Sequence, residues 1–508
     1  MTHSLTVSQT TSAYRHNSSA GRREWTALGV LVVAVLLVAL DATVLFLALP
    51  VISESLHPSA TQLLWIGDAY SFVLAGLLVS MGSLSDRIGR KRVLLTGSAA
   101  FAAASVLAAY APGPGWLIAA RALLGVAGAT IMPATLSLIR SLFPDERERA
   151  RAIGIWGAAA TAGAAAGPLL GGLLLEHFWW GSVFLMNVPL VAVLLLLGAR
   201  LLPESRDPEP GAWDLPSVGL SLTGVVATVY AVKVAAVDGP WRADVALTLV
   251  LGAAGLWLFV RRQLRLRVPL LDVRLFREPR FTAAVAGALM ALIGLAGVLF
   301  FLSQYFQLVR GWSPLRAGLA DMPAFLGSTV GGLVAAGLAR RLGARRALVG
   351  GLLAMGLGAG LLGLLRGDTP YLAIAAVFLA IGAVEGVVYA LSTTMVLDAA
   401  PAEKAGAAGA VSETAYELGT ALCFDLVAAA LTEDYRAGLP FGGRAADSLG
   451  DALAVAERQG GPQGAELARA AKDSFVHAMH AASLLSAGLL VAAAVIVHLL
   501  LRTRRRAA

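Results

Sequence analysis

Five carboxylates stand inside stretches of the chain that are otherwise apolar. They are Asp41, Asp68, Glu385, Glu413 and Glu417. An ionisable side chain in the hydrocarbon region of a bilayer is costly, so such residues usually face the interior of a helix bundle or a wet cavity. Acids placed in this way on several helices can take up protons and attract cations. Their pattern indicates a transport pathway through a membrane.

Glu413 and Glu417 are four residues apart, so they share one face of a helix. Two like charges in a low-dielectric environment favour protonation of one of them. For Asp41 and Asp68 we favour a functional role over a satisfied polar contact. Three further acids could join this set: Asp321, Glu385 and Asp425. A structural role is equally open for Asp321 and Asp425, which lie toward helix ends.

Arg121 is the one cation expected within the N-terminal spans, and a carboxylate or backbone carbonyls must receive its charge. A role in proton coupling and a purely structural pair both stay open for it. Six aromatic residues could hold a lipophilic cation against a ring face, although each could equally be a packing residue. They are Trp65, Tyr70, Phe72, Trp156, Tyr305 and Tyr416.

The composition is that of a membrane protein. Hydrophobic residues make up 57% and charged residues 14% of the 508 positions, against roughly 25% charged in soluble domains. The net charge is +8, but the arginines lie between apolar runs, so no nucleic-acid partner is expected. Cys423 is the single cysteine, which excludes an intrachain disulfide and a cysteine-based metal site. The sequence contains no G-x-x-x-x-G-K-[ST] loop, and we expect no cofactor, no metal and no enzymatic activity.

Runs of about 20 apolar residues predict membrane-spanning helices. We expect fourteen, which gives an all-helical fold of two six-helix bundles with two extra helices between them. The expected spans are 27–49, 63–83, 93–111, 116–138, 152–175, 181–202, 215–236, 244–260, 281–308, 315–338, 347–366, 371–396, 407–432 and 477–501. The first run is too long for the core of a cleavable signal peptide, and the helix-breaking Pro50 follows it.

The distribution of charge sets the expected orientation. With both termini in the cytoplasm, most of the 40 Lys and Arg fall in cytoplasmic segments, as the positive-inside rule requires. We expect a multi-pass protein of the bacterial cytoplasmic membrane, in contact with lipid. Its expected parts are a disordered tail at 1–26, the first bundle at 27–202, a linker with the two extra spans and a basic loop at 203–280, the second bundle at 281–501 and a basic tail at 502–508.

A long external loop is expected at 433–476. Two stretches of helical spacing, 447–458 and 464–477, flank a Gly-rich turn and predict a small helical hairpin within it.

A faint internal repeat relates the two bundles. The segment 82–92 follows the second expected span, and 337–346 follows the tenth, with Gly89 and Gly343 aligned. Parallel repeats of this kind place a binding site between the two halves, near the middle of the bilayer.

Three motifs resemble those of the major facilitator superfamily. The string Gly82-x-Leu-x-Asp86-Arg87-x-Gly89-Arg90-Lys91-Arg92 resembles motif A, Arg121-Ala-Leu-Leu-Gly125-Val-Ala-Gly128 resembles motif B, and Gly163-x-x-x-Gly167-Pro168-x-x-Gly171-Gly172, followed by Asn187-Val-Pro189, resembles the antiporter motif C. The resemblance implies that Asp86 faces a helix N-terminus in the other half and stabilises the outward-facing state. It also implies close helix contact at the motif C glycines and a kink at Pro168.

The segments around Asp41 and Asp68 resemble the first two helices of the fourteen-helix drug:proton antiporters, the quaternary-ammonium pumps of the QacA and SmvA type. They read Leu40-Asp41-Ala-Thr43 and Trp65-Ile-Gly-Asp68-Ala-Tyr70. The match continues at 269–276, 313–318 and 410–419, and so covers essentially the whole chain after the tail. The chain departs from these pumps at Ser412, where some carry a second acid beside Glu413, and at Ser328, which aligns with their tenth-helix acid. Glu385 has no family counterpart.

The resemblance implies a proton-coupled antiporter that exports lipophilic cationic drugs, dyes or antiseptics, and we expect it to be a monomer. Protons and cations would compete for the cavity acids, and rocking of the two halves would expose the cavity to each side in turn. Two alternatives stay open. One is a dedicated exporter of an endogenous product, such as an antibiotic, a lipid or a peptide. The other is a non-transporting membrane sensor or scaffold.

Overall fold

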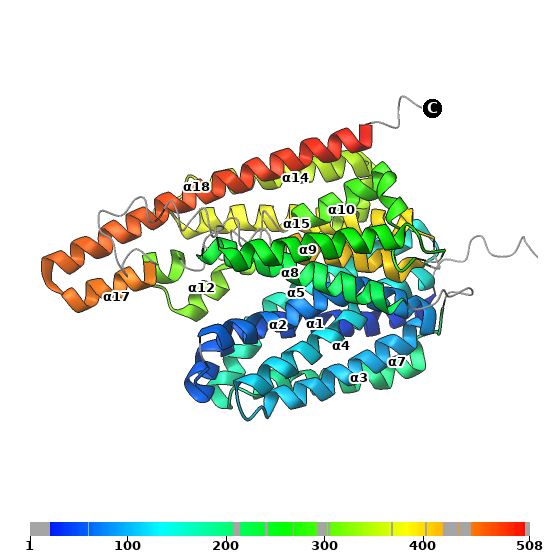
Figure 1. The fold of residues 1–508 in the computed structure, drawn as a ribbon. Helices are drawn as coiled ribbons and strands as arrows, with labels where there is room; N and C mark the ends of the chain where they lie inside the picture. Colours follow the sequence, from blue (N-terminus) through cyan, green and yellow to red (C-terminus); the bar gives the residue numbers. More distant parts are fainter. Residues whose placement is uncertain are drawn as a thin grey trace, which may run out of the picture.

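Long helices lie side by side along one common direction (Figure 1). The structure is a computed structural model that describes residues 21–58, 60–206, 214–238, 242–267, 269–291, 302, 305–366, 369–401, 404–419, 435 and 449–502. Among these residues, 12 helices are long and apolar enough to cross a membrane. Helices suit a bilayer because they satisfy their backbone hydrogen bonds internally.

The first six expected spans are all helical. They correspond to α1 (Arg22–Leu56), α2 (Ala60–Ile88), α3 (Arg90–Ala109), α4 (Pro114–Leu142), α5 (Glu146–His177) and the pair α6 (Ser182–Leu185) and α7 (Asn187–Leu201). Helix α1 packs mainly on α5, and α2 packs on α4. The expectations for both ends of α1 were wrong: its helix begins at Arg22, inside the expected tail, and continues beyond Pro50 to Leu56. Membrane helices tolerate a proline where neighbouring groups re-satisfy the freed carbonyl.

The two central spans are α8 (Leu215–Asp238) and α9 (Ala243–Gln263). They approach closely at Gly224, Gly252 and Gly255, where an added Cβ would overlap the partner helix. Helix α8 also packs on α2, and Ser221 Oγ donates a hydrogen bond to the carbonyl of Gly76 across 3.2 Å. The central pair is thereby attached to the first group of helices.

The second group of helices includes α10 (Pro279–Ala291), the π-helical turn η2 (Tyr305–Val309), α12 (Pro314–Ala320), α13 (Met322–Leu342), α14 (Ala344–Leu362), α15 (Tyr371–Ala399) and an unlabelled helix at 405–419. The expected spans 281–308 and 407–432 run into residues outside the described part, and neither is among the 12 counted helices. The expected span 315–338 is divided at Asp321, because Pro323 has no N–H to continue the helix from α12.

The chain ends in a hairpin of α17 (Leu449–Gln459) and α18 (Gly461–Arg502). Gly460 and Gly461 make its turn with φ of 60° and 61°, a conformation that glycine adopts without strain. The predicted pair of helices is confirmed, but the second is not a separate element. It continues without a break into the last span as one 42-residue helix, and Figure 1 shows α17 beside its projecting end.

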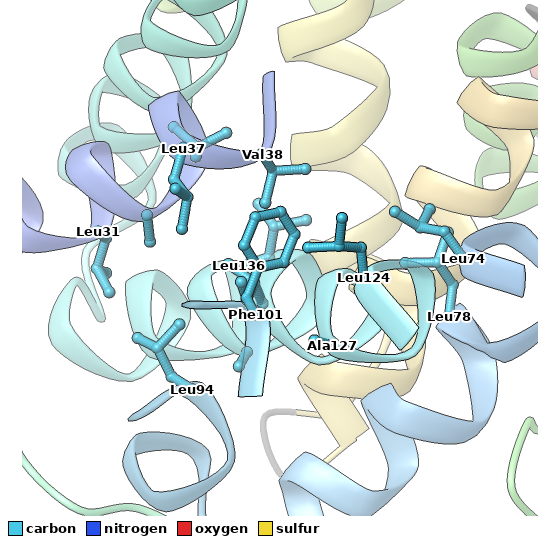
Figure 2. Packing of buried hydrophobic residues seen from close by; sticks show 14 of the residues in the cluster. Leu31, Leu37, Val38, Leu74, Leu78, Leu94, Phe101, Leu124, Ala127 and Leu136 are labelled. Carbon is cyan, nitrogen blue, oxygen red and sulfur yellow. The ribbon is translucent and has the colours of Figure 1, made fainter. Parts of the chain in front are cut away.

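Two main hydrophobic clusters form the interior. The first draws mostly on α1 to α5 and α7, and Figure 2 shows Phe101 of α3 in this cluster, with Leu124 and Leu136 of α4 and Val38 of α1. The second draws on helices of the second group, chiefly α14, α15 and α18. The internal repeat is visible in the backbone, since Gly89 (φ 124°) and Gly343 (φ 81°) precede α3 and α14 in the same way.

Candidate functional site

Asp41 of α1 and Arg121 of α4 form an ion pair in the interior of the first group of helices. Both are buried, with exposed fractions of 0% and 1%. Arg121 Nη1 donates to Asp41 Oδ2 across 3.2 Å, and its Nε donates to the carbonyl of Ile66 across 3.3 Å. The guanidinium carbon lies 4.8 Å from the centre of the Tyr70 ring. A carboxylate, a carbonyl and a ring face together receive the charge.

A second donor holds the other oxygen of Asp41. Asn187, the first residue of α7, donates from Nδ2 to Asp41 Oδ1 across 2.7 Å and to Ser105 Oγ across 3.1 Å. Both oxygens of Asp41 therefore accept hydrogen bonds from the protein. This role of Asn187 was not predicted from its motif, although its position in an otherwise apolar run was a signal for a buried polar contact.

Asp68 lies on α2, but its side chain is outside the described part of the structure, as is the side chain of Pro168 on α5. The whole of Asp425 is outside it. The structure therefore places none of these three side chains relative to the other acids.

An aromatic and carboxylate cluster joins the two groups of helices. Glu413 accepts a hydrogen bond from the hydroxyl of Tyr389 on α15 across 2.9 Å. The Tyr389 ring stacks on Trp156 of α5, with centroids 6.1 Å apart, and lies 4.6 Å from the ring of Tyr416. Trp156 is fully buried and donates from Nε1 to Thr135 Oγ1. Tyr389 was missed in the sequence analysis, although it follows Glu385 by one helical turn.

Glu417 follows Glu413 by one turn and is partly buried. Glu385 is 2% exposed on α15, and Ser328 Oγ of α13 donates to its Oε2 across 2.5 Å. Glu385 therefore contacts Ser328, the residue that we expect to align with an acid of the resembled pumps. Asp321 lies apart at the break between α12 and α13 and is partly buried, and its Oδ1 has no hydrogen-bond partner among the described residues.

Three of the six expected aromatic residues pack against other aromatic side chains. Trp65 stacks on Tyr230 of α8 and meets Phe72 edge-on, so this pair belongs to the contact between α2 and α8. Tyr305 belongs to a separate cluster with Phe306, and its hydroxyl donates to the carbonyl of Arg366. The structure brings Trp156 and Tyr416 against Tyr389, the hydrogen-bond partner of Glu413, and places Tyr70 under Arg121.

The motif A residues join the two groups of helices at one end. Asp86 accepts hydrogen bonds from the backbone N–H of Gly406 (2.9 Å) and Ala407 (3.2 Å), near the start of the helix at 405–419. Arg90 pairs with the same carboxylate across 3.0 Å. Gly82 lies against the backbone of Gly406, where a Cβ would overlap the carbonyl. Arg87 is partly exposed.

Two further contacts close the same end. Arg149 of α5 pairs with Asp398 of α15 across 2.6 Å, and Arg140 of α4 donates to the carbonyl of Ala400 across 2.7 Å. Two features favour glycine at position 89: its φ is positive, and a Cβ there would lie 2.6 Å from the Glu204 carboxylate.

The motif C glycines permit close packing of α5 on α1. Cβ atoms at Gly163, Gly167 and Gly171 would meet residues of α1 between Leu36 and Val44. Gly172 follows on the same helix. Within the described residues, no group of three His, Cys, Asp or Glu could hold a metal ion. The described side chains of the site are buried acids, one paired arginine and aromatic rings.

Buried charges inside a bundle of many membrane-spanning helices are typical of a membrane transporter. Comparison with known proteins gives the family. The profile of the Major Facilitator Superfamily matches residues 31–423. The chain belongs to this superfamily, as its motifs led us to expect.

Relatives with assigned names resemble the chain along most of its length. It is 46% identical over 483 residues to the multidrug efflux pump LfrA of Mycolicibacterium smegmatis, covering 94% of this chain and 96% of that protein. It is 38% identical over 474 residues to the methyl viologen resistance protein SmvA of Salmonella typhimurium, covering 92% and 96%. The puromycin resistance protein pur8 of Streptomyces alboniger is 38% identical over 410 residues, covering 79% and 80%.

A solved structure supports the fold. The human organic anion transporter MFSD10 (TETRAN) superposes with a TM-score of 0.63, covering 93% of this chain and 99% of that one. The sequence identity is 16%, so this likeness shows the shared fold alone.

Proposed function

We propose that this chain is a proton-coupled multidrug efflux antiporter that exports lipophilic cations. The observation that carries the proposal is the contact between Trp156 of the first group of helices and the Tyr389–Glu413 pair of the second. Stacked rings beside a buried carboxylate form a setting in which a flat cation gains both cation–π and charge attraction. The names of the relatives, two of them efflux or methyl viologen resistance proteins, support the same class of cargo.

The proposal assigns different tasks to the two sets of acids. Asp68, Glu413 and Glu417 exchange protons for the cation, while Asp41 is held by Arg121 and releases this partner only when the pair reorganises. Competition between proton and cation for one carboxylate is what antiport requires, since each ligand must favour a different state.

We propose fourteen spans in total, with both termini in the cytoplasm. The described part of the chain supplies 12, and the expected spans at 281–308 and 407–432 supply the other two. The division then follows the expected pattern of a first bundle at 27–202, a linker with two spans at 203–280 and a second bundle at 281–501. In this arrangement α17 and the N-terminal part of α18 lie outside the cell, the rest of α18 crosses the membrane, and the transporter acts as a monomer in the bacterial cytoplasmic membrane.

Substrate-induced proton release from purified protein tests the proposal. Addition of a dye or quaternary ammonium compound should release protons from the parent, and Asp68→Asn should release fewer at equal occupancy. Equal release from both proteins would refute the role of Asp68, and no release from the parent would refute antiport.

Cargo charge gives a second test. Methyl viologen carries two positive charges and can use two separated carboxylates, whereas a monovalent cation needs only one. Glu413→Gln should therefore reduce export of methyl viologen more than export of a monovalent dye. Equal losses of export for both compounds would show that Glu413 does not recognise the charge of the cargo. If the parent exports neither compound, a dedicated exporter of another compound is favoured.

A further inference from the structure

Two hydroxyl groups connect Glu385 to the first group of helices. Ser328 Oγ of α13 lies 2.5 Å from Glu385 Oε2 and 3.1 Å from Thr161 Oγ1 of α5. Thr161 Oγ1 in turn lies 3.2 Å from the carbonyl of Gly157. We call this series, Glu385–Ser328–Thr161–Gly157, the hydroxyl chain. It crosses between the two groups of helices inside the bundle.

Backbone packing fixes the geometry of the hydroxyl chain. A Cβ at Gly382 or Gly386 of α15 would overlap the backbone of α13. Glu385 lies between these two glycines, so its side chain is held opposite Ser328. Helices α5 and α13 also touch backbone to backbone where Gly154 meets Gly332. Ser328 and Thr161 therefore have little room to separate while α5, α13 and α15 stay packed.

The protonation state of Glu385 decides which way the hydrogen bonds point. A hydroxyl group carries one proton and can accept another bond, whereas an ionised carboxylate only accepts. With Glu385 ionised, Ser328 donates to it and Thr161 donates to Ser328. With Glu385 protonated, its own proton goes to Ser328, Ser328 donates to Thr161, and Thr161 donates to the carbonyl of Gly157. Each hydroxyl donates a hydrogen bond in both states. The two bonds at Ser328 reverse direction, and the bond from Thr161 to the carbonyl of Gly157 belongs to the protonated state alone.

The hydrogen bonds of the hydroxyl chain differ in strength between the two protonation states of Glu385. A hydrogen bond to an ionised carboxylate is about twice as strong as a neutral one, and it polarises the next bond in a chain. An ionised Glu385 therefore tightens the contact between Ser328 and Thr161, and a proton on Glu385 weakens it. The same structure is closed at the Asp86 end, where Asp86 bonds to Gly406.

We propose that Glu385 is a proton-controlled link between the two halves of the transporter. Ionised, it holds α5 against α13 through the hydroxyl chain; protonated, it loosens that contact and allows the halves to rearrange. This inference rests on the proposed antiport and adds to it a proton-exchanging acid that acts on the contact between the halves, not on the cargo.

Other titratable groups surround Glu385. Tyr389 on its own helix and Tyr416 on the helix at 405–419 lie within electrostatic reach. Glu413 lies beyond Tyr389 and accepts a hydrogen bond from the Tyr389 hydroxyl. Asp321 lies about two helical turns before Ser328. In the described part of the chain, Glu385 forms no ion pair. Its charge is therefore stabilised chiefly by Ser328, which places the hydroxyl chain in direct control of its protonation.

A distance measurement without substrate tests the link. Spin labels at Glu146→Cys, at the start of α5, and Arg341→Cys, near the end of α13, are placed in a Cys423→Ala background. Both positions are exposed and lie toward the same end of this helix pair, since the two helices run antiparallel past each other. The distance distribution is recorded as pH is varied across the range in which a buried carboxylate titrates.

The parent should show a pH-dependent shift between a short and a long distance. Glu385→Gln should lose that shift, and Thr161→Val should reduce its amplitude about twofold or more, because the stronger bond of the ionised state no longer reaches α5. Thr161→Ser keeps the hydroxyl and should behave as the parent. The matched control is Thr329→Val, since among the described residues the Thr329 hydroxyl bonds within its own helix alone, to the carbonyl of Phe325.

Two results would overturn the link: a shift in Glu385→Gln equal to that of the parent, or an unchanged amplitude in Thr161→Val. Either would leave the proposed antiport intact, because the measurement uses no cargo. Conversely, the parent could show the expected pH-dependent shift but no substrate-induced proton release. That result would refute antiport and leave the proposed link supported.

Discussion

Arg121 and Asp41 hold each other 3.2 Å apart across α4 and α1, and the interior of the first group of helices leaves both without contact to solvent. Removing one partner of such a pair leaves an uncompensated buried charge, which costs about 3–5 kcal/mol. Asp41→Asn should therefore lower the unfolding temperature of the purified protein strongly, and the double variant Asp41→Asn/Arg121→Gln should recover part of the loss. Thermal unfolding in a double-mutant cycle measures the coupling.

The exposed pair of Arg242 and Asp244, 2.9 Å apart, provides the control. Arg242→Gln should leave the unfolding temperature nearly unchanged, because exposed pairs contribute little to stability. Strictly additive losses in the Asp41 and Arg121 cycle would contradict the interpretation of a mutually dependent pair.

Asp86→Asn should slow transport more than it weakens binding of a cation. The carboxylate bonds to the N–H groups of Gly406 and Ala407 near a helix N-terminus, a contact worth up to about 2 kcal/mol. Loss of that energy shifts the balance between conformations by up to about 30-fold without touching the acids of the site. Transport rates in vesicles and binding of a fluorescent cation separate the two effects. The exposed Glu146→Gln serves as control, and a variant with normal transport but weakened binding would exclude the latch.

Asp214 should make folding stability depend on acid pH. It lies just before α8, and its hydrogen bonds from Arg262 (2.7 and 2.8 Å) lower the pKa of the carboxyl below its usual value. The contribution is complete above the unfolded pKa of about 4 and is lost as pH falls through the lower folded value. Asp214→Asn should lower stability by about 1 kcal/mol at neutral pH and flatten this acid loss. Unfolding curves at several pH values check it, with the exposed Glu466→Gln as control; parallel curves would contradict the prediction.

Gly386→Ala should disrupt the packing of α13 on α15. The added Cβ would overlap the carbonyl of Ser328, a backbone atom that cannot move aside. Gly350→Ala on α14 is the matched control, since nothing lies within 4 Å of its Cβ. The control should be neutral or more stable by up to about 1 kcal/mol, because alanine favours helix over glycine. Folded yield and unfolding temperature distinguish them, and equal behaviour of the two variants would show that the contact is loose.

Orientation can be tested by labelling single cysteines in sealed cells. In a Cys423→Ala background, Gln463→Cys near the turn between α17 and α18 should react with an impermeant reagent, whereas Glu146→Cys should react only after lysis. Both residues are exposed in the structure. The outer loop position Gly438→Cys and the linker position Pro208→Cys, both beyond the described residues, should follow the same rule. Labelling of Glu146→Cys or Pro208→Cys in intact cells would overturn the proposed topology.

The 12 spans found in the described part of the chain were predictable because apolar length is a local property of the sequence. Breaks within or at the ends of helices were not, as α1 shows by continuing past Pro50. A proline ends a helix in water more readily than in a membrane bundle, where neighbours can satisfy the freed carbonyl. The continuity of α18 was missed for a similar reason, since polar residues before His477 suggested an end to the span that the backbone does not make.

The candidate site was predictable as a set of residue types and not as a set of contacts. Charge inside an apolar run singled out Asp41, Arg121 and Glu385, because burial of charge needs a reason. Which groups meet depends on how helices distant in sequence pack, so the contact of Glu385 with Ser328 and that of Asp41 with Asn187 could be seen only in the fold.

The length of α18 has a practical consequence. At about 1.5 Å per residue, its 42 residues extend roughly 63 Å, about twice the hydrocarbon thickness of a bilayer. No proline interrupts it beyond Pro462 in its first turn. A binding protein raised against α17 and the N-terminal half of α18 would therefore be rigidly connected to the second bundle. The complex with this binding protein would have an asymmetric landmark for image alignment. The angle of the bound protein would report directly how the bundle tilts during a transport cycle.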